Sequence, residues 1–135
     1  MVLVHIVVMA LHILCAVILV GGAIAWRFGA IPGIQLLEAE TRTKVDNAIA
    51  ATWKPVLFFA IAGVLLSGIV NLIEAGQRTP RFHMVFGLKM LAVLHLLAVS
   101  VLATRADNPR RSRQLTGVVV SGVIIVILSA ALRWV

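Results

Sequence analysis

The sequence predicts an all-α integral membrane protein, folded as a four-transmembrane-helix bundle with up-down-up-down topology. Hydrophobic residues make up 61% of the 135-residue chain, and the mean hydropathy is +1.08, far above that of a soluble domain. A membrane-spanning helix needs roughly 20 mostly apolar residues, because the hydrocarbon core is about 30 Å thick and each residue rises about 1.5 Å. Four such runs fill most of the chain, so we expect one domain, residues 1–135, with helices at about 2–25, 45–73, 83–105 and 115–133.

The first predicted helix starts almost at the N-terminus. No basic segment precedes it, and its apolar run is longer than the roughly 7–15 residues of a signal-peptide core, so we expect a retained helix. Trp26, Trp53 and Trp134 each fall at a predicted helix end. Indole rings favour the headgroup level of a bilayer, so these positions support the predicted boundaries.

The second predicted helix follows the longest loop, in which Pro32 and Gly33 mark a turn. Pro55 is expected either to kink this helix or to mark its first turn. Short connections precede the third and fourth helices, and such connections favour antiparallel neighbours.

Small residues recur at four-residue spacing on the second and fourth predicted helices. The pairs are Gly63 with Ser67 and Gly117 with Ser121. This spacing lets helix backbones approach closely in lipid, so we expect these residues to serve helix packing. No internal repeat is recognised along the chain, and no nucleophile has a base at helical spacing, so a hydrolytic site is not expected.

Basic residues are distributed unevenly between the two ends of the predicted bundle. Eight of them lie in or beside the first and third loops, and three lie at the opposite end. The positive-inside rule then predicts a bacterial-type inner (plasma) membrane protein with both termini on the outer, periplasmic side. The net charge of +7 comes without a recognition motif or interleaved aromatic residues, so we expect the lipid bilayer and no nucleic acid as its partner. The eight residues are Arg27, Arg42, Lys44, Lys54, Arg105, Arg110, Arg111 and Arg113, and the three are Arg78, Arg81 and Arg133.

All four histidines lie on the first and third predicted helices, which are diagonal neighbours in such a bundle. His12 and His95 fall near the middle of these two helices, which run in the same direction, so we expect them at matched depth. Bundle cofactors are held by side chains that project inward from facing helices. His12 and His95 are therefore predicted to be the axial ligands of one haem b iron. For either histidine alone, a hydrogen bond to a neighbouring helix is the alternative.

Other polar residues lie on the outer halves of the same helices. Lys89 and Arg81 are candidates to meet the haem propionates, and snorkelling to the membrane surface is the alternative for Lys89. His5 and His83 are secondary ligand candidates nearer the helix ends. His5 and His12 are separated by only about 10 Å along the helix, so we expect one haem rather than two stacked haems.

Sulfur-containing residues suggest copper as the alternative cofactor. A stripe on the first helix consists of His5, Met9, His12 and Cys15. Met84 falls on the face of the third helix that carries His95. Thioether, thiol and imidazole ligands together suit Cu(I), whereas ordinary apolar packing is the simpler role for Met9 and Cys15.

Three segments resemble known membrane-protein families, and together they cover most of the chain. The segment "LHILCAVILVGGAIAWRF" resembles the first helix of HemJ-type membrane proteins. The segment "RFHMVFGLKMLAVLHLLAVSVLATR" resembles the lysine-bearing helix shared by HemJ-type proteins and the copper-resistance protein D (CopD) family. The segment "WKPVLFFAIAGVLLSGIVNL" is similar to a helix of the CopD family.

The HemJ resemblance implies a b-type haem and an oxidoreductase role in porphyrin metabolism, and it carries over to His12 and Lys89 but not to His95. The CopD resemblance implies copper uptake across the inner membrane. The sequence thus predicts a haem b-binding protein in electron transfer or a haem-linked oxidoreductase role. A quinone or a redox partner subunit would be its electron partner, and a homo-oligomer is left open. The alternatives are CopD-like copper handling and a cofactor-free small subunit of a larger complex.

Overall fold

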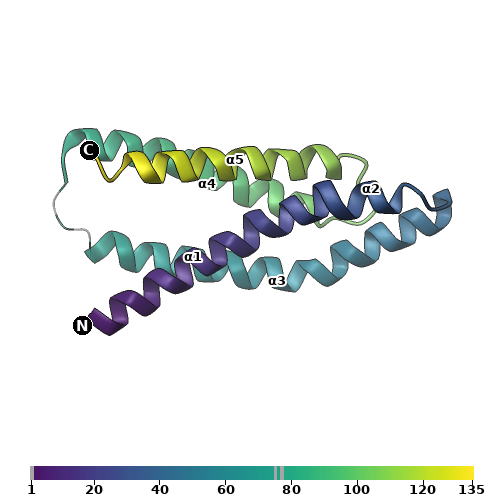
Figure 1. Ribbon diagram of the computed structural model, residues 1–135, viewed down its shortest axis with the longest axis horizontal. Coiled ribbons are helices and arrows are strands. Elements are labelled where there is room, and N and C mark those ends of the chain that lie inside the picture. The colour runs from purple at the N-terminus through teal and green to yellow at the C-terminus, as the bar shows by residue number, and fades with distance from the viewer. Residues whose placement is uncertain (1, 75, 77) are drawn as a thin grey trace.

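The computed structural model describes residues 2–74, 76 and 78–135, and the regular secondary structure of these residues is helical throughout (Figure 1). Four helical stretches are long and apolar enough to cross a membrane, which confirms the predicted all-α class. The elements are α1 (Val2–Ile24), the π-helix η1 (Ala25–Ala30), α2 (Ile31–Ile34), α3 (Ala39–Glu74), α4 (Pro80–Ala103) and α5 (Arg111–Ala131).

The first helical stretch runs on past its predicted end. Instead of stopping near residue 25, the helical stretch continues from α1 through η1 and α2 and ends at Ile34. A π-helical turn has i→i+5 hydrogen bonds, which changes the direction in which successive side chains point. Both Trp26, in η1, and Ile31, which follows it, are buried. Trp26 is therefore a core residue here and not an indole exposed at the membrane surface.

Helix α3 begins at Ala39, six residues earlier than expected. An ion pair between Lys44 and Glu40, four residues apart with 2.8 Å between Nζ and Oε1, lies on its exposed first turns. Its 36 residues correspond to about 54 Å, more than the hydrocarbon thickness of about 30 Å. Pro55 lies inside the helix, which bends near its middle (Figure 1). Proline lacks the N–H that would bond to the preceding turn, which accounts for such a bend.

Helix α4 also begins earlier than expected, because its first turn is capped. The Thr79 hydroxyl accepts a hydrogen bond from the Phe82 N–H at 3.2 Å, and Pro80 occupies the first helical position. Both features are typical of a helix N-terminus. The α4–α5 loop turns at Asp107, whose φ is +48°, a conformation that aspartate tolerates better than most residues.

The helices form two closely packed pairs. The first helix pair is α1 with α3, and the second helix pair is α4 with α5 (Figure 1). Contacts of α1 with α5 and, less extensively, of α3 with α4 join the two pairs. Among the described residues α1 and α4 do not pack closely together, so they lie across the molecule from each other.

The buried core fills only the half of the molecule nearest the α4–α5 loop. Among the described residues, burial begins at Cys15 in α1 and ends at Ser67 in α3. It begins at Leu96 in α4 and ends at Gly122 in α5. Beyond these positions the two helix pairs diverge toward the end of the molecule that holds both termini (Figure 1).

Glycines allow the close approach of helices that the sequence predicts. A Cβ atom added at Gly63 would collide with the Cys15 Sγ, and one added at Gly22 would collide with the Trp53 ring. At Gly122 an added Cβ would lie 2.8 Å from the Val20 side chain. The predicted role of Gly63 in close helix packing is confirmed.

We expect Gly63→Ala to lower the free energy of unfolding by about 1–3 kcal/mol, the usual cost of overpacking. The double variant Gly63→Ala/Cys15→Ala should recover most of this loss, because the added methyl group would occupy the space of the deleted Sγ. Thermal unfolding in detergent measures both effects. Gly21→Ala is the matched control, since an added Cβ at Gly21 meets no atom within 4 Å. Equal effects of Gly63→Ala and Gly21→Ala would contradict the predicted contact.

Candidate functional site

His12 is held by a serine on the neighbouring helix α3. The His12 Nδ1 lies 3.0 Å from the Ser67 Oγ, and Ser67 is only 3% exposed. The Ser67 hydroxyl donates its hydrogen to the Gly63 carbonyl at 2.5 Å, so its oxygen is left to accept. The His12 Nδ1–H is then the donor to Ser67, and the Nε2 of the neutral imidazole keeps a free lone pair.

A glycine makes room for the His12 ring. Gly68 follows the serine, and a Cβ added there would lie 3.3 Å from the His12 Cε1. This distance is tighter than ordinary van der Waals contact, so a larger residue at position 68 would displace the ring. Ser67 and Gly68 together fix where the imidazole lies.

His95 has the same kind of partner in the second helix pair. Its Nδ1 lies 2.7 Å from the Oγ of Ser121, which is 5% exposed. A Cβ added at Gly117 would lie 3.6 Å from the His95 Cε1. Each helix pair therefore carries one histidine that is held through Nδ1 by a buried serine.

A short internal repeat underlies this correspondence and corrects the expectation that the chain contains none. Residues 63–68 read GVLLSG and residues 117–122 read GVVVSG, so four of six positions are identical. Residues 11–12 and 94–95 both read LH. This motif is the sequence signal that could have identified Ser67 and Ser121 as histidine partners, whereas spacing alone indicated only packing.

The two histidines do not lie at the same depth, so the expectation of matched depth is wrong. Gly122, which follows the His95 partner Ser121, packs against Val20 of α1. His12 is eight residues before Val20, which is about 12 Å farther along the helix. Matched depth would require α4 to start later than its capped first residue, Pro80.

Lys89 of α4 is the residue that lies level with His12. Ala51 and Thr104 line one pocket and so share a level. Ser67 lies 16 residues after Ala51, and Lys89 lies 15 residues before Thr104, about 24 and 22 Å at the rise of a helix. Lys89 is half-buried. We call His12, Ser67 and Lys89 the His12 site.

The remaining predicted site residues are exposed. Arg81 and His83 are exposed on the first turn of α4, and the exposed His5 Nδ1 is 2.6 Å from Glu74 Oε2. The methionines of the copper hypothesis are also exposed, Met9 by 39% and Met84 by 64%. Within the described part of the chain, no group of three or more His, Cys, Asp or Glu residues is placed to hold a metal ion.

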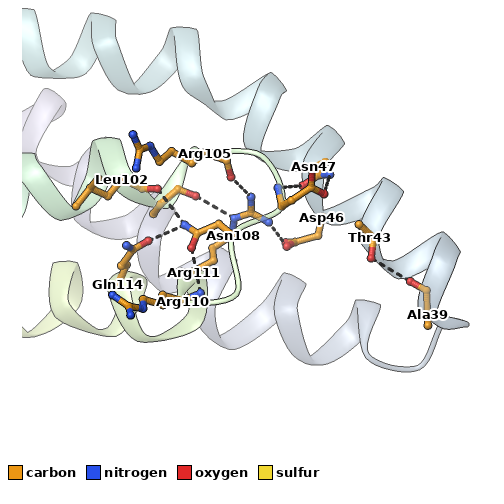
Figure 2. A network of polar contacts seen from close by, with 12 residues as sticks. Ala39, Thr43, Asp46, Asn47, Leu102, Arg105, Asn108, Arg110, Arg111 and Gln114 are labelled. Carbon is orange, nitrogen blue, oxygen red and sulfur yellow. Dashed lines mark hydrogen bonds and ion pairs between the residues drawn. The ribbon is translucent and has the colours of Figure 1, made fainter.

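A buried arginine organises the opposite end of the molecule. Arg111 is 2% exposed and forms an ion pair with Asp46 of α3 (Figure 2). Its Nε donates to the Ala103 carbonyl at 2.9 Å, its Nη2 donates to the Arg105 carbonyl, and its Cζ lies 5.5 Å from the centre of the Trp26 ring. The sequence pattern predicts that Arg111 is one of the exposed loop charges. In the structure Arg111 is buried and contacts η1, α3 and α4 from the first residue of α5.

Comparison of the chain with protein-family models, curated proteins and solved structures finds no match. The His12 site offers a neutral imidazole with a free nitrogen lone pair, oriented by a buried hydroxyl. Lys89, on the helix across the molecule, lies at about the same level by the rise of the two helices. This combination suits a metal-centred cofactor that carries its own anionic groups.

Proposed function

We propose that this chain crosses a membrane four times and binds one haem b between α1 and α4, for electron transfer or a haem-linked oxidoreductase role. The four long apolar helices support membrane insertion. The basic residues of the first and third loops support a bacterial-type inner membrane location with both termini outside and alternating helix directions.

The hydrogen-bond chain from His12 through Ser67 to the Gly63 carbonyl carries this proposal. Histidines that ligate metals donate their second ring N–H to such a partner, which fixes the tautomer and the ring orientation. Because the porphyrin itself supplies four nitrogen ligands, a haem requires no larger protein cluster. We therefore propose His12 Nε2 as an axial ligand of the iron.

Lys89 gives the site its second feature. An ionisable residue inside a membrane is costly and usually faces the bundle interior, where it meets a partner. Lys89 is half-buried at about the level of His12, where a cation could pair with an anionic propionate. The HemJ resemblance points to the same two residues.

The two helix pairs diverge on the side of the molecule that holds the His12 site (Figure 1). Among the described residues, none is buried in the diverging half beyond Cys15, Ser67, Leu96 and Gly122. Side chains in this half are therefore less deeply buried than those around Arg111, and a bound haem would bury part of them. A bound haem would supply a one-electron redox couple, while Ser67 orients His12 and Lys89 balances charge.

His95 does not fit the role of second ligand to the same iron. Two imidazoles on one metal bring their nitrogens to about 4 Å, since each bond is about 2 Å long. An axial offset of about 12 Å, added to the separation of diagonal helices, exceeds what the two side chains span. We assign His95 to the contact with Ser121 that joins α4 to α5. A quinone or a redox partner subunit remains the proposed electron partner.

A reduced-minus-oxidised visible spectrum of the detergent-purified protein, with metal analysis of the same sample, tests the proposal. We expect a Soret band and sharp α and β bands on reduction, with about one haem per chain. A featureless spectrum with stoichiometric copper would favour CopD-like copper handling. A folded protein with neither cofactor would overturn the proposal in favour of a cofactor-free subunit.

A further inference from the structure

An open pocket of about 600 Å³ lies where α3 passes the end of α4. Two of its residues, Lys54 and Arg105, are basic, and two are alanines, whose short side chains leave the pocket open. The lining residues are Asn47, Ala51, Lys54, Thr104, Arg105 and Ala106. The contact between α3 and α4 is the least extensive of those between neighbouring long helices, so the pocket opens at the weakest seam of the bundle.

The two positive charges of this pocket are not neutralised by ion pairs. Three ion pairs occur among the described residues, and neither Lys54 nor Arg105 belongs to any of them. Arg105 binds Arg111 only through its backbone carbonyl, and its guanidinium turns away from Arg111 (Figure 2). Two acids are next in sequence to pocket residues, and both have partners: Asp46 pairs with Arg111, and the Asp107 carboxylate accepts a hydrogen bond from Asn47 Nδ2 at 2.8 Å.

The pocket lies at the depth where lipid phosphates are found if α3 spans a bilayer. Lys54 is 20 residues from Glu74, the last residue of α3, which is about 30 Å of helix. This length equals the usual hydrocarbon thickness, so Lys54 falls at the boundary when Glu74 lies at the opposite one. Arg105 follows the end of α4 and lines the same pocket.

We propose that this pocket binds the phosphate of an anionic phospholipid from the leaflet facing the basic loops. Basic pockets between membrane helices are suited to such headgroups, and charge-assisted hydrogen bonds from lysine and arginine are strong. The available donors are the Lys54 ammonium, the Arg105 guanidinium and the second amide hydrogen of Asn47. The Thr104 hydroxyl is not among them, because it donates to the Val101 carbonyl at 2.8 Å.

The bound lipid would bridge the two helix pairs at their weakest seam and so stabilise the fold. The inference requires membrane insertion but not the haem, so its outcome and that of the haem proposal are independent. Its test compares wild type with Lys54→Gln/Arg105→Gln. The matched control is Arg110→Gln/Arg113→Gln, which removes the same charge from exposed residues of the same region outside the pocket.

Thermal unfolding and native mass spectrometry in detergent would be measured with added phosphatidylglycerol, phosphatidylcholine or inorganic phosphate. We expect phosphatidylglycerol to bind and stabilise wild type and the control, with apparent affinity about tenfold lower in the pocket variant. Phosphatidylcholine and inorganic phosphate should have little effect on any of them.

Equal stabilisation of the pocket variant and the control by phosphatidylglycerol would overturn the proposal. So would equal binding of phosphatidylcholine to wild type, whereas stabilisation by inorganic phosphate alone would show a free-anion site and overturn the lipid assignment. If the double variant does not fold, Lys54→Gln alone is compared with Arg110→Gln, with the same expected order of affinities.

Discussion

Replacing Arg111 with leucine is expected to lower the free energy of unfolding by about 3–5 kcal/mol, the usual effect of removing one partner of a buried ion pair. The guanidinium pairs with Asp46 and also satisfies two backbone carbonyls at the end of α4. Leucine fills part of the volume but leaves all these acceptors without a donor. Chemical or thermal unfolding in detergent measures the loss.

Two further variants make this prediction specific. Arg113→Leu, an exposed position two residues away on α5, should change the free energy of unfolding by no more than about 0.5 kcal/mol. Arg111→Leu/Asp46→Leu should recover part of the stability, because it removes the unpaired carboxylate as well. If Arg111→Leu is no more destabilising than Arg113→Leu, the buried ion pair contributes nothing and the predicted role of Arg111 is wrong.

His12→Ala is expected to abolish haem binding, while His95→Ala retains most of the haem. His12 carries a free Nε2 lone pair at about the level of Lys89. His95 lies about 12 Å nearer the end of the molecule that holds the α4–α5 loop. The haem-to-protein ratio after purification, determined from the pyridine haemochrome spectrum, should fall at least tenfold in His12→Ala. Ser67→Ala should weaken haem affinity by about 10- to 100-fold, as for other groups that orient a ligand.

His5→Ala is the control, because His5 is exposed and contacts Glu74 near the end of the molecule that holds both termini. It should bind haem like wild type. Full haem retention by both His12→Ala and His95→Ala would remove the ligand assignment altogether. Equal loss of haem in the two variants would instead support the pairing of His12 with His95, and would require the helix pairs to shift relative to each other.

The sequence predicts the presence of the four long helices, though not their exact ends, because apolar length is a local signal. Apolar length identifies a spanning helix without knowledge of its neighbours, and Gly63 indicates close packing by its spacing alone. Depth was not predictable in the same way, because it depends on where α4 is capped and on how Val20 meets Gly122. The sequence predicts that Lys89 lies near the cofactor. That Lys89 lies at the level of His12 can be seen only from the contacts between the helices.

The burial of Arg111 shows the same limit for charges. In the sequence it is one of several arginines in a short polar stretch, where the positive-inside rule explains all of them equally well. Its actual environment depends on Asp46, 65 residues earlier, and on Trp26 in a π-helical turn that the composition does not reveal. Pairings of this kind arise only when distant segments meet.

The confinement of the buried core to one half of the molecule has a mechanical consequence. Closely packed regions resist deformation, so we expect the half around Arg111 to stay rigid while the diverging ends of the two helix pairs tilt relative to each other. His12 lies about 21 Å along the helix axis from Trp26. A tilt of the helix by about 5° around Trp26 would therefore move His12 by about 2 Å. A lipid between α3 and α4 and a ligand at His12 would contact the two helix pairs at opposite ends of the molecule. Both would therefore influence the angle between the two helix pairs.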